Sequence, residues 1–183
     1  MDEIKNIRFD DINLQEDEKI LWEGTPNRRI IFSKSDIVYL SASILFLLYT
    51  SILNLTNILF IILQVYLILG RFIVKYTKKS RSKYVVTNKR VLKIYKTLSG
   101  ETEVNSCNIE NLQKPVLSIN SRKKIGTIYF GAYLYYEYLT YENTGLEMFC
   151  FDYWTYKPLS FYDISDAKRV FGIVTELISK NKQ

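Results

Sequence analysis

The strongest pattern in the chain is a long run of apolar residues inside an otherwise mixed sequence. Between Asp36 and Arg71 there is no Asp, Glu, Lys or Arg. As a single helix, residues 37–70 would be about 50 Å long at about 1.5 Å per residue, whereas the apolar core of a bilayer is about 30 Å thick. One straight helix would therefore overshoot a membrane, and the run must bend or tilt.

A break in the middle of the run provides the bend. The segment 54–57 reads Asn-Leu-Thr-Asn and is rich in turn-forming residues. It divides the run into two helices at about 37–53 and 58–74, which we expect to fold into a transmembrane hairpin within residues 36–74, since backbone groups in lipid must be satisfied within a helix. Each half is short for a full span, so a re-entrant hairpin and a buried hairpin of a soluble protein are the alternatives.

After the apolar run the pattern changes to short segments rich in β-branched and aromatic residues. These predict about seven antiparallel strands, at 83–87, 90–96, 103–109, 116–120, 125–130, 132–141 and 146–154. Helical spacing of apolar residues returns in the last segment and predicts an amphipathic C-terminal helix at about 166–180.

The predicted fold class is therefore α+β. It combines a transmembrane helical hairpin with a small antiparallel β-barrel or sandwich, capped by the C-terminal helix. The expected organisation is an N-terminal cytosolic segment at 1–35, the hairpin at 36–74 and a cytosolic domain at 75–183. The acidic start of the chain does not resemble a cleavable signal peptide.

Charge predicts how the hairpin is oriented. Arg28, Arg29 and Lys34 precede the apolar run, several more cations follow it, and the segment 54–57 carries no charge. Under the positive-inside rule both flanks lie in the cytoplasm and the bend lies outside. We therefore expect a multi-pass protein of the cell membrane with both termini in the cytoplasm.

The cations behind the hairpin are dense enough to suggest a ligand. Residues 71–96 contain ten Lys or Arg and no acidic residue, and the net charge of the chain is +6. Six of these residues form what we call the basic collar: Arg71, Lys75, Lys78, Lys79, Arg81 and Lys83. Such clusters beside a membrane helix attract anionic lipid headgroups. The alternative is that they only fix the topology; no motif points to nucleic acid.

Two further residues are candidates for membrane roles. Trp22 is an amphipathic ring shortly before the apolar run, so it is a candidate interfacial anchor, with packing into the cytosolic domain as the alternative. Gln64 places an amide within the apolar run, where it seeks a hydrogen-bonding partner and favours association of membrane helices.

Composition argues against catalysis. The chain has no histidine and only two cysteines, Cys107 and Cys150. Histidine is the commonest general base and metal ligand, and two distant cysteines alone do not form a zinc site. No phosphate-binding glycine loop or nucleophile motif is present. We therefore expect neither an enzyme nor a protein that binds a metal or cofactor.

Four segments resemble bacterial pleckstrin-homology-like (PH-like) membrane proteins. They are Glu-Lys-Ile-Leu-Trp-Glu-Gly-Thr-Pro at 18–26, Tyr-Val-Val-Thr-Asn-Lys-Arg-Val at 84–91, Gly-Thr-Ile-Tyr-Phe at 126–130 and Phe-Tyr-Asp-Ile at 161–164. The resemblance implies a β-barrel capped by a helix, and a binding or scaffolding role rather than catalysis. It also implies that Thr87, Arg90 and Gly126 shape turns and strands. The fold alone names no ligand.

Together these observations predict a membrane-anchored, non-catalytic PH-like module. Its partners would be another protein or copies of itself at the cytoplasmic face, with anionic lipid as a further contact. The alternative is a subunit of an oligomeric transporter or channel, for which Gln64 is the only notable intramembrane amide.

Overall fold

The computed structural model describes residues 13–28, 32, 34–53, 57–97, 100–112, 114–120, 125–130 and 159–181. These residues form two compact units. The first contains the described parts of Met1–Arg28, Lys78–Tyr133 and Pro158–Gln183, and the second contains those of Arg29–Thr77.

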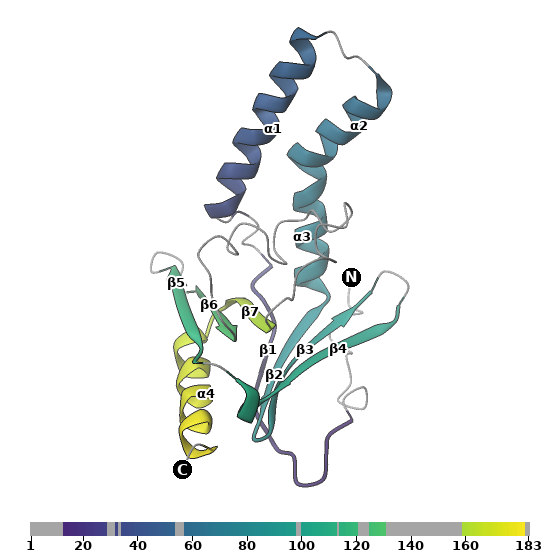
Figure 1. Ribbon diagram of the computed structural model, residues 1–183. Helices are drawn as coiled ribbons and strands as arrows, with labels where there is room; N and C mark the ends of the chain where they lie inside the picture. Colours follow the sequence, from purple (N-terminus) through teal and green to yellow (C-terminus); the bar gives the residue numbers. More distant parts are fainter. Residues whose placement is uncertain are drawn as a thin grey trace. The chain divides into compact units, whose positions relative to one another are not determined.

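The first unit contains a four-stranded antiparallel sheet with the order β1-β2-β3-β4 (Figure 1). Its strands are β1 (Ile20–Gly24), β2 (Ser82–Thr87), β3 (Arg90–Lys96) and β4 (Thr102–Asn108). The three strands β2, β3 and β4 form a meander, because tight turns follow β2 and β3. Gly100 has a φ of 91°, a conformation that suits glycine, in the turn before β4.

A second, three-stranded antiparallel sheet has the order β5-β6-β7. Its strands are β5 (Val116–Asn120), β6 (Ile125–Phe130) and β7 (Leu159–Ile164). The helix α4 (Ala167–Asn181) follows β7 and contacts β5 and β6, as Figure 1 shows. A 3-10 turn at Ile109–Asn111 separates β4 from β5.

The main core of this unit draws on both sheets and on α4. It contains the buried side chains Tyr84, Val86, Val91, Ile109, Leu112, Ile128, Phe130, Phe161, Ile164, Ala167, Val170, Val174 and Ile178. The buried positions of α4 recur every three or four residues, as the helical pattern predicts. Phe161 lies at the centre, with its ring 4.6 Å from that of Tyr84 and 4.8 Å from that of Phe130.

The α+β class, the antiparallel strands and the C-terminal helix are confirmed, but the expected barrel is wrong. The described strands form two separate sheets with no closed barrel among them. The chain leaves β4 through the 3-10 turn and then passes Pro115, which has no N–H to donate, so β5 starts a new sheet. The strands β1 and β7 were not predicted, and the predicted strands at 132–141 and 146–154 lie outside the described residues.

The second unit consists of two antiparallel helices. The first is α1 (Lys34–Ile52), and the second is continuous through α2 (Ile58–Val65), a π-helical turn η3 (Tyr66–Gly70) and α3 (Arg71–Ser80), whose last three residues belong to the first unit. Asn57 caps α2 by accepting a hydrogen bond from the N–H of Leu59 at 2.9 Å. The predicted bend at 54–57 therefore coincides with a helix start.

The second helix is longer than the sequence predicted. It runs to Ser80, and the 23 residues Ile58–Ser80 are long and apolar enough, by those two criteria alone, to cross a membrane. The apolar helix Asp36–Ile52 is shorter. Among the described residues this is the one helix of spanning length.

Candidate functional site

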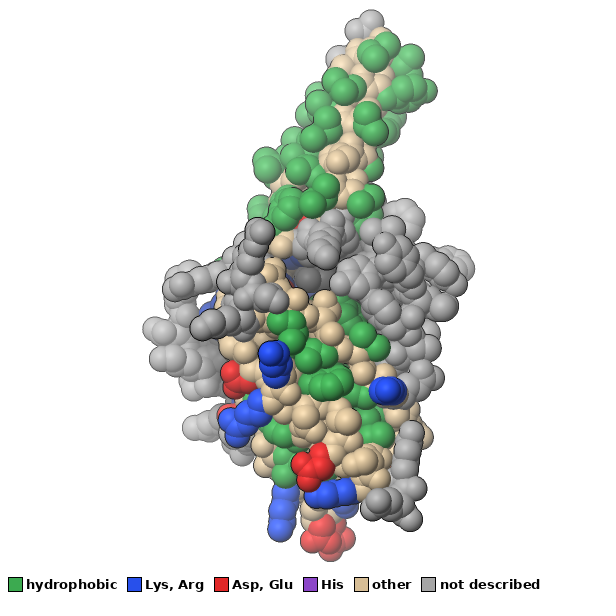
Figure 2. All heavy atoms as spheres, turned by 90° about the vertical axis from the view of Figure 1, so that its left-hand side faces the viewer, with side chains coloured by type: hydrophobic (Ala, Val, Ile, Leu, Met, Phe, Trp, Pro, Cys, Tyr) green, Lys and Arg blue, Asp and Glu red, His purple; other side chains and the backbone are tan. Residues whose placement is uncertain are grey.

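The helix pair of the second unit has polar residues inside and apolar residues outside. Within 36–53 and 57–77, the residues that are buried are Asp36, Ser43, Thr50, Arg71 and Lys75, all of them polar. Large apolar side chains face outward instead: Leu45 is 66 %, Leu59 69 % and Ile52 78 % exposed. Figure 2 shows hydrophobic side chains covering the visible face of these helices. A helix pair from the core of a soluble protein has the reverse arrangement.

The buried polar residues of α1 recur every seven residues and so lie on one face of that helix. At one end of this face, Thr50 accepts a hydrogen bond from the side-chain amide of Gln64 in α2. In the middle, the Ser43 hydroxyl donates to the carbonyl of Tyr39 one turn earlier, at 2.7 Å. The predicted partner-seeking amide of Gln64 thus has its partner within the same helix pair.

At the other end, Asp36 holds two cations of the second helix. The Nζ of Lys75 lies 2.5 Å from Asp36 Oδ2, and the Nη1 of Arg71 lies 3.3 Å from Oδ1. Arg71 also donates through Nη2 to the backbone carbonyl of Asp36 at 3.0 Å. All three side chains are at most 1 % exposed. We call these three residues the Asp36 cluster.

Aromatic rings complete the surroundings of Arg71. Its guanidinium carbon lies 4.6 Å from the ring centre of Phe72 and 5.7 Å from that of Tyr39. Such cation–π contacts suit a desolvated guanidinium. Removing the Asp36 carboxylate would leave two buried cations, which is far more destabilising than an apolar replacement of the whole set. The cluster therefore fixes the pairing of α1 with the second helix.

The other members of the basic collar are also engaged within the protein. In the first unit, the Nζ of Lys79 forms an ion pair with Asp163 in β7. The Nη1 of Arg81 donates to the carbonyl of Thr97 at 2.8 Å, and Lys83 pairs with Glu23 at 3.3 Å. The backbone carbonyl of Lys78 accepts a hydrogen bond from the Ser82 hydroxyl at 2.8 Å. The residues of the basic collar therefore make contacts within the protein, and their contact with lipid stays a prediction.

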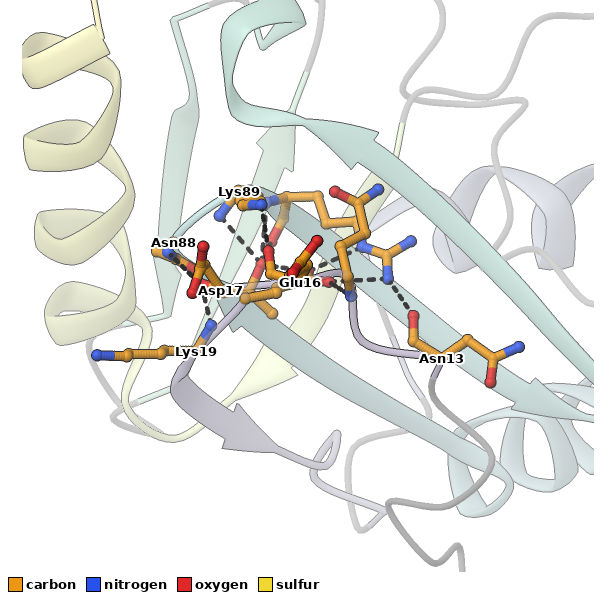
Figure 3. A network of polar contacts seen from close by, with 10 residues as sticks. Asn13, Glu16, Asp17, Lys19, Asn88 and Lys89 are labelled. Carbon is orange, nitrogen blue, oxygen red and sulfur yellow. Dashed lines mark hydrogen bonds and ion pairs between the residues drawn. The ribbon is translucent and has the colours of Figure 1, made fainter.

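A second polar network joins the chain before β1 to the turn between β2 and β3 (Figure 3). The Glu18 carboxylate accepts hydrogen bonds from the Thr87 hydroxyl at 2.7 Å and from Arg90 at 2.9 and 3.0 Å. It also accepts one from the N–H of Gln15 at 2.8 Å. We call Glu18, Thr87 and Arg90 the Glu18 clasp.

Backbone contacts extend the clasp along the turn. Asn88 accepts from the N–H of Lys19 at 2.7 Å and donates to the carbonyl of Asp17 at 3.1 Å, and Lys89 donates to the carbonyl of Glu16 at 2.5 Å. In Figure 3, Glu16 and Asp17 lie beside Asn88 and Lys89 of the turn. Burial raises the pKa of Glu18, but the hydrogen bonds from Arg90, Gln15 and Thr87 outweigh it and hold the pKa below its ordinary value of 4.5.

The four segments that carry the PH-like resemblance meet in space as two pairs. Segment 18–26 contains β1, which pairs with β2 in segment 84–91. Segment 126–130 coincides with most of β6, which pairs with β7 in segment 161–164. The order of these segments along the chain is a feature of the sequence, but their pairing was not predicted.

Trp22 lies in this assembly rather than apart from it. Its ring stacks on Phe161 at 5.9 Å, and it packs against the main core. This geometry agrees with the packing alternative for Trp22, and the role as an interfacial anchor stays a prediction.

Gly126 allows a close contact between β6 and α4. A Cβ built on Gly126 would lie 2.5 Å from the Cβ of Ala167 and 3.1 Å from the carbonyl oxygen of Ser118. The register of β6 with β7 also shifts between Gly126 and Ile128. The strand-shaping role that the resemblance implies for this residue has a steric basis.

The described residues offer little for chemistry. No group of three or more His, Cys, Asp or Glu that could hold a metal lies among them. Burial raises the pKa of the Cys107 thiol, which disfavours the reactive thiolate. The carboxylate of Glu18 accepts hydrogen bonds from Gln15, Thr87 and Arg90 of the same chain. What the arrangement supplies is a compact β-rich unit and a helix pair with an apolar surface.

Comparison with known proteins adds no relative. No family model, no curated protein and no solved structure matches the chain.

Proposed function

We propose that the chain is a membrane-anchored, non-catalytic binding or scaffolding module with a PH-like unit at the cytoplasmic face of the cell membrane. In this proposal the helix pair of the second unit inserts into lipid as a hairpin. The β-rich unit then meets a protein partner or further copies of the chain. The observation that carries the proposal is the inverted arrangement of the helix pair, with polar side chains buried and apolar side chains exposed.

The inversion has a simple physical reading. In water, apolar side chains that are more than half exposed along two whole helices would form a surface far larger than a soluble monomer tolerates. In lipid the same surface is satisfied, and buried polar side chains find partners inside the helix pair. The Thr50–Gln64 hydrogen bond and the ion pairs of Asp36 with Arg71 and Lys75 cross between the two helices, and Ser43 bonds within α1.

The position of the charges agrees with a membrane boundary. Charged side chains are costly within the apolar core of a bilayer, and those that occur pair with each other. The Asp36 cluster lies at the start of α1 and within α3, away from the bend at 54–57. It is internally paired, so it is compatible with the edge of the lipid.

Membrane fractionation tests the proposal directly. The full chain is expressed, membranes are washed with alkaline carbonate, and the protein is expected in the pellet until detergent is added. Recovery in the supernatant without detergent contradicts the proposal.

A matched pair of variants identifies the lipid-facing surface. Ile62, which is 59 % exposed in α2, is changed to Lys or to Leu. A lysine at the middle of a membrane helix costs about 2.5–3.5 kcal/mol of insertion free energy, so Ile62→Lys should shift protein into the wash while Ile62→Leu should not. Equal retention of both variants contradicts lipid contact at this face.

A further inference from the structure

The strand β4 forms an unusually open edge of the four-stranded sheet. It pairs on one side with β3, in seven consecutive pairs without a register shift. Six of its seven residues are exposed, and only Cys107 is half-buried, where it packs against the main core. Within the described part of the chain, the ladder bonds of β4 run to β3 alone.

The other edge strands of this unit carry features that discourage pairing. The strand β1 has a register shift between Ile20 and Trp22. The strands β5 and β7 directly follow Pro115 and Pro158. Natural edges are protected by charged side chains, proline or bulges. The sequence of β4, Thr-Glu-Val-Asn-Ser-Cys-Asn, has no proline and no bulge, and Glu103 is its single charge.

The sequence of β4 permits an antiparallel pair with a second copy of the strand. In an antiparallel pair centred on Asn105, all seven residues find a partner: Thr102 meets Asn108, Glu103 meets Cys107 and Val104 meets Ser106. The two Asn105 side chains meet each other and can each donate and accept a hydrogen bond. No like charges lie opposite one another, whereas a centre on Glu103 would oppose two carboxylates.

A second copy fits this edge better than a foreign peptide does. When a foreign strand is added to a sheet, the backbone provides affinity and side-chain pockets provide specificity. The six exposed residues of β4 provide no walls for such pockets. Two identical copies can pair through their backbones with no like charges opposite one another, and a shared membrane raises their effective concentration.

We propose that β4 pairs antiparallel with β4 of a second copy, centred on Asn105, and so joins two four-stranded sheets into one. This inference rests on the proposed function, because it names the self-association of the membrane-anchored module.

Disulfide crosslinking of the full chain in native membranes tests the register. Asn105→Cys is made with Cys107→Ser and Cys150→Ser, so that each chain carries one thiol. Opposite Cα atoms lie about 4.5–5.5 Å apart in such a pair, within the range that a disulfide bridges. Glu103→Cys in the same background is the control, because its two thiols are offset by about 13 Å along the strands. Oxidation is expected to crosslink Asn105→Cys and to leave Glu103→Cys as a monomer.

A charge placed on the symmetry axis tests the association itself. Asn105→Lys opposes two ammonium groups, and Asn105→Ser keeps the strand neutral. In mild detergent the unmodified chain and Asn105→Ser should show a protein mass near twice the 21.6 kDa of one chain, and Asn105→Lys should show a single chain. Far-ultraviolet circular dichroism of both variants reports whether the fold is intact.

Each other result overturns the inference. A monomeric unmodified chain rules out the pair. Equal crosslinking at both positions, or a dimer that survives Asn105→Lys, places the contact elsewhere. A mixed disulfide of Asn105→Cys with another protein makes that protein the occupant. In all these cases retention in the carbonate pellet leaves the membrane module standing, so the two failures are distinguishable.

Discussion

At the scale of single residues, the Glu18 clasp links folding stability to pH. The pKa of Glu18 in the folded protein lies below 4.5, so as pH falls the unfolded chain takes up its proton first. The stabilisation is therefore complete above about pH 4.5 and is lost as pH falls through the lower, folded pKa. At neutral pH, Glu18→Gln should lower the free energy of unfolding by about 1.5–3 kcal/mol, which is the contribution of a hydrogen bond to a charged group.

Thermal unfolding of the full chain in mild detergent measures this effect. The difference in Tm between the unmodified chain and Glu18→Gln should be largest near about pH 6 and should shrink towards about pH 3. Glu16→Gln, at an exposed neighbouring carboxylate, is the control and should leave the Tm unchanged. A constant difference across this range would show that the ionised carboxylate is not responsible.

Gly126 provides a steric prediction with a built-in rescue. Gly126→Ala places a Cβ 2.5 Å from that of Ala167 and should lower the free energy of unfolding by about 1–3 kcal/mol, as overpacking does. Adding Ala167→Gly removes the opposing atom and should recover part of the loss. Chemical denaturation of the two variants and of Ala167→Gly alone checks this. No recovery in the double variant would mean that the contact with Ser118 dominates.

At the scale of elements, the Asp36 cluster should act as a unit. Asp36→Asn leaves Arg71 and Lys75 buried without a carboxylate and should destabilise the helix pair by about 3–5 kcal/mol. The triple change Asp36→Leu, Arg71→Met, Lys75→Met removes every charge of the cluster and should destabilise the helix pair less than Asp36→Asn does. Thermal aggregation of the detergent-solubilised chain ranks the variants. A triple variant that aggregates at a lower temperature than Asp36→Asn would contradict charge pairing as the main role of the cluster.

The elements also show what sequence patterns determine. Local patterns were sufficient for β2 to β6 and for α4, because strand alternation, turn residues and helical spacing are all short-range signals. The strands β1 and β7 were missed because their partners β2 and β6 are distant in sequence. The barrel was predicted from the number of strands and from the PH-like resemblance, and the 3-10 turn before Pro115 divides the strands into two sheets.

The candidate site was predictable only in part, for the same reason. Charge counting located the basic collar, but the acidic partners lie far away in sequence: Asp36 for Arg71 and Lys75, and Asp163 for Lys79. The spacing of Arg71 and Lys75, one turn apart within a helix, was the available signal, and it was hidden because the second helix was expected to end at 74. Asp36 was read only as the boundary of the apolar run.

At the scale of the whole molecule, the proposed hairpin predicts which parts face which side of the membrane. Single cysteines at Asn57, which caps α2, and at Glu176, exposed in α4, are made with Cys107→Ser and Cys150→Ser. A membrane-impermeant maleimide added to intact cells should label Asn57→Cys at once and Glu176→Cys only after the membrane is opened, because the cations flanking the hairpin stay inside. Labelling of both positions only after opening contradicts the spanning hairpin. Together with retention in the carbonate pellet, it would establish a re-entrant hairpin, whose helices enter and leave the lipid from the cytoplasmic side.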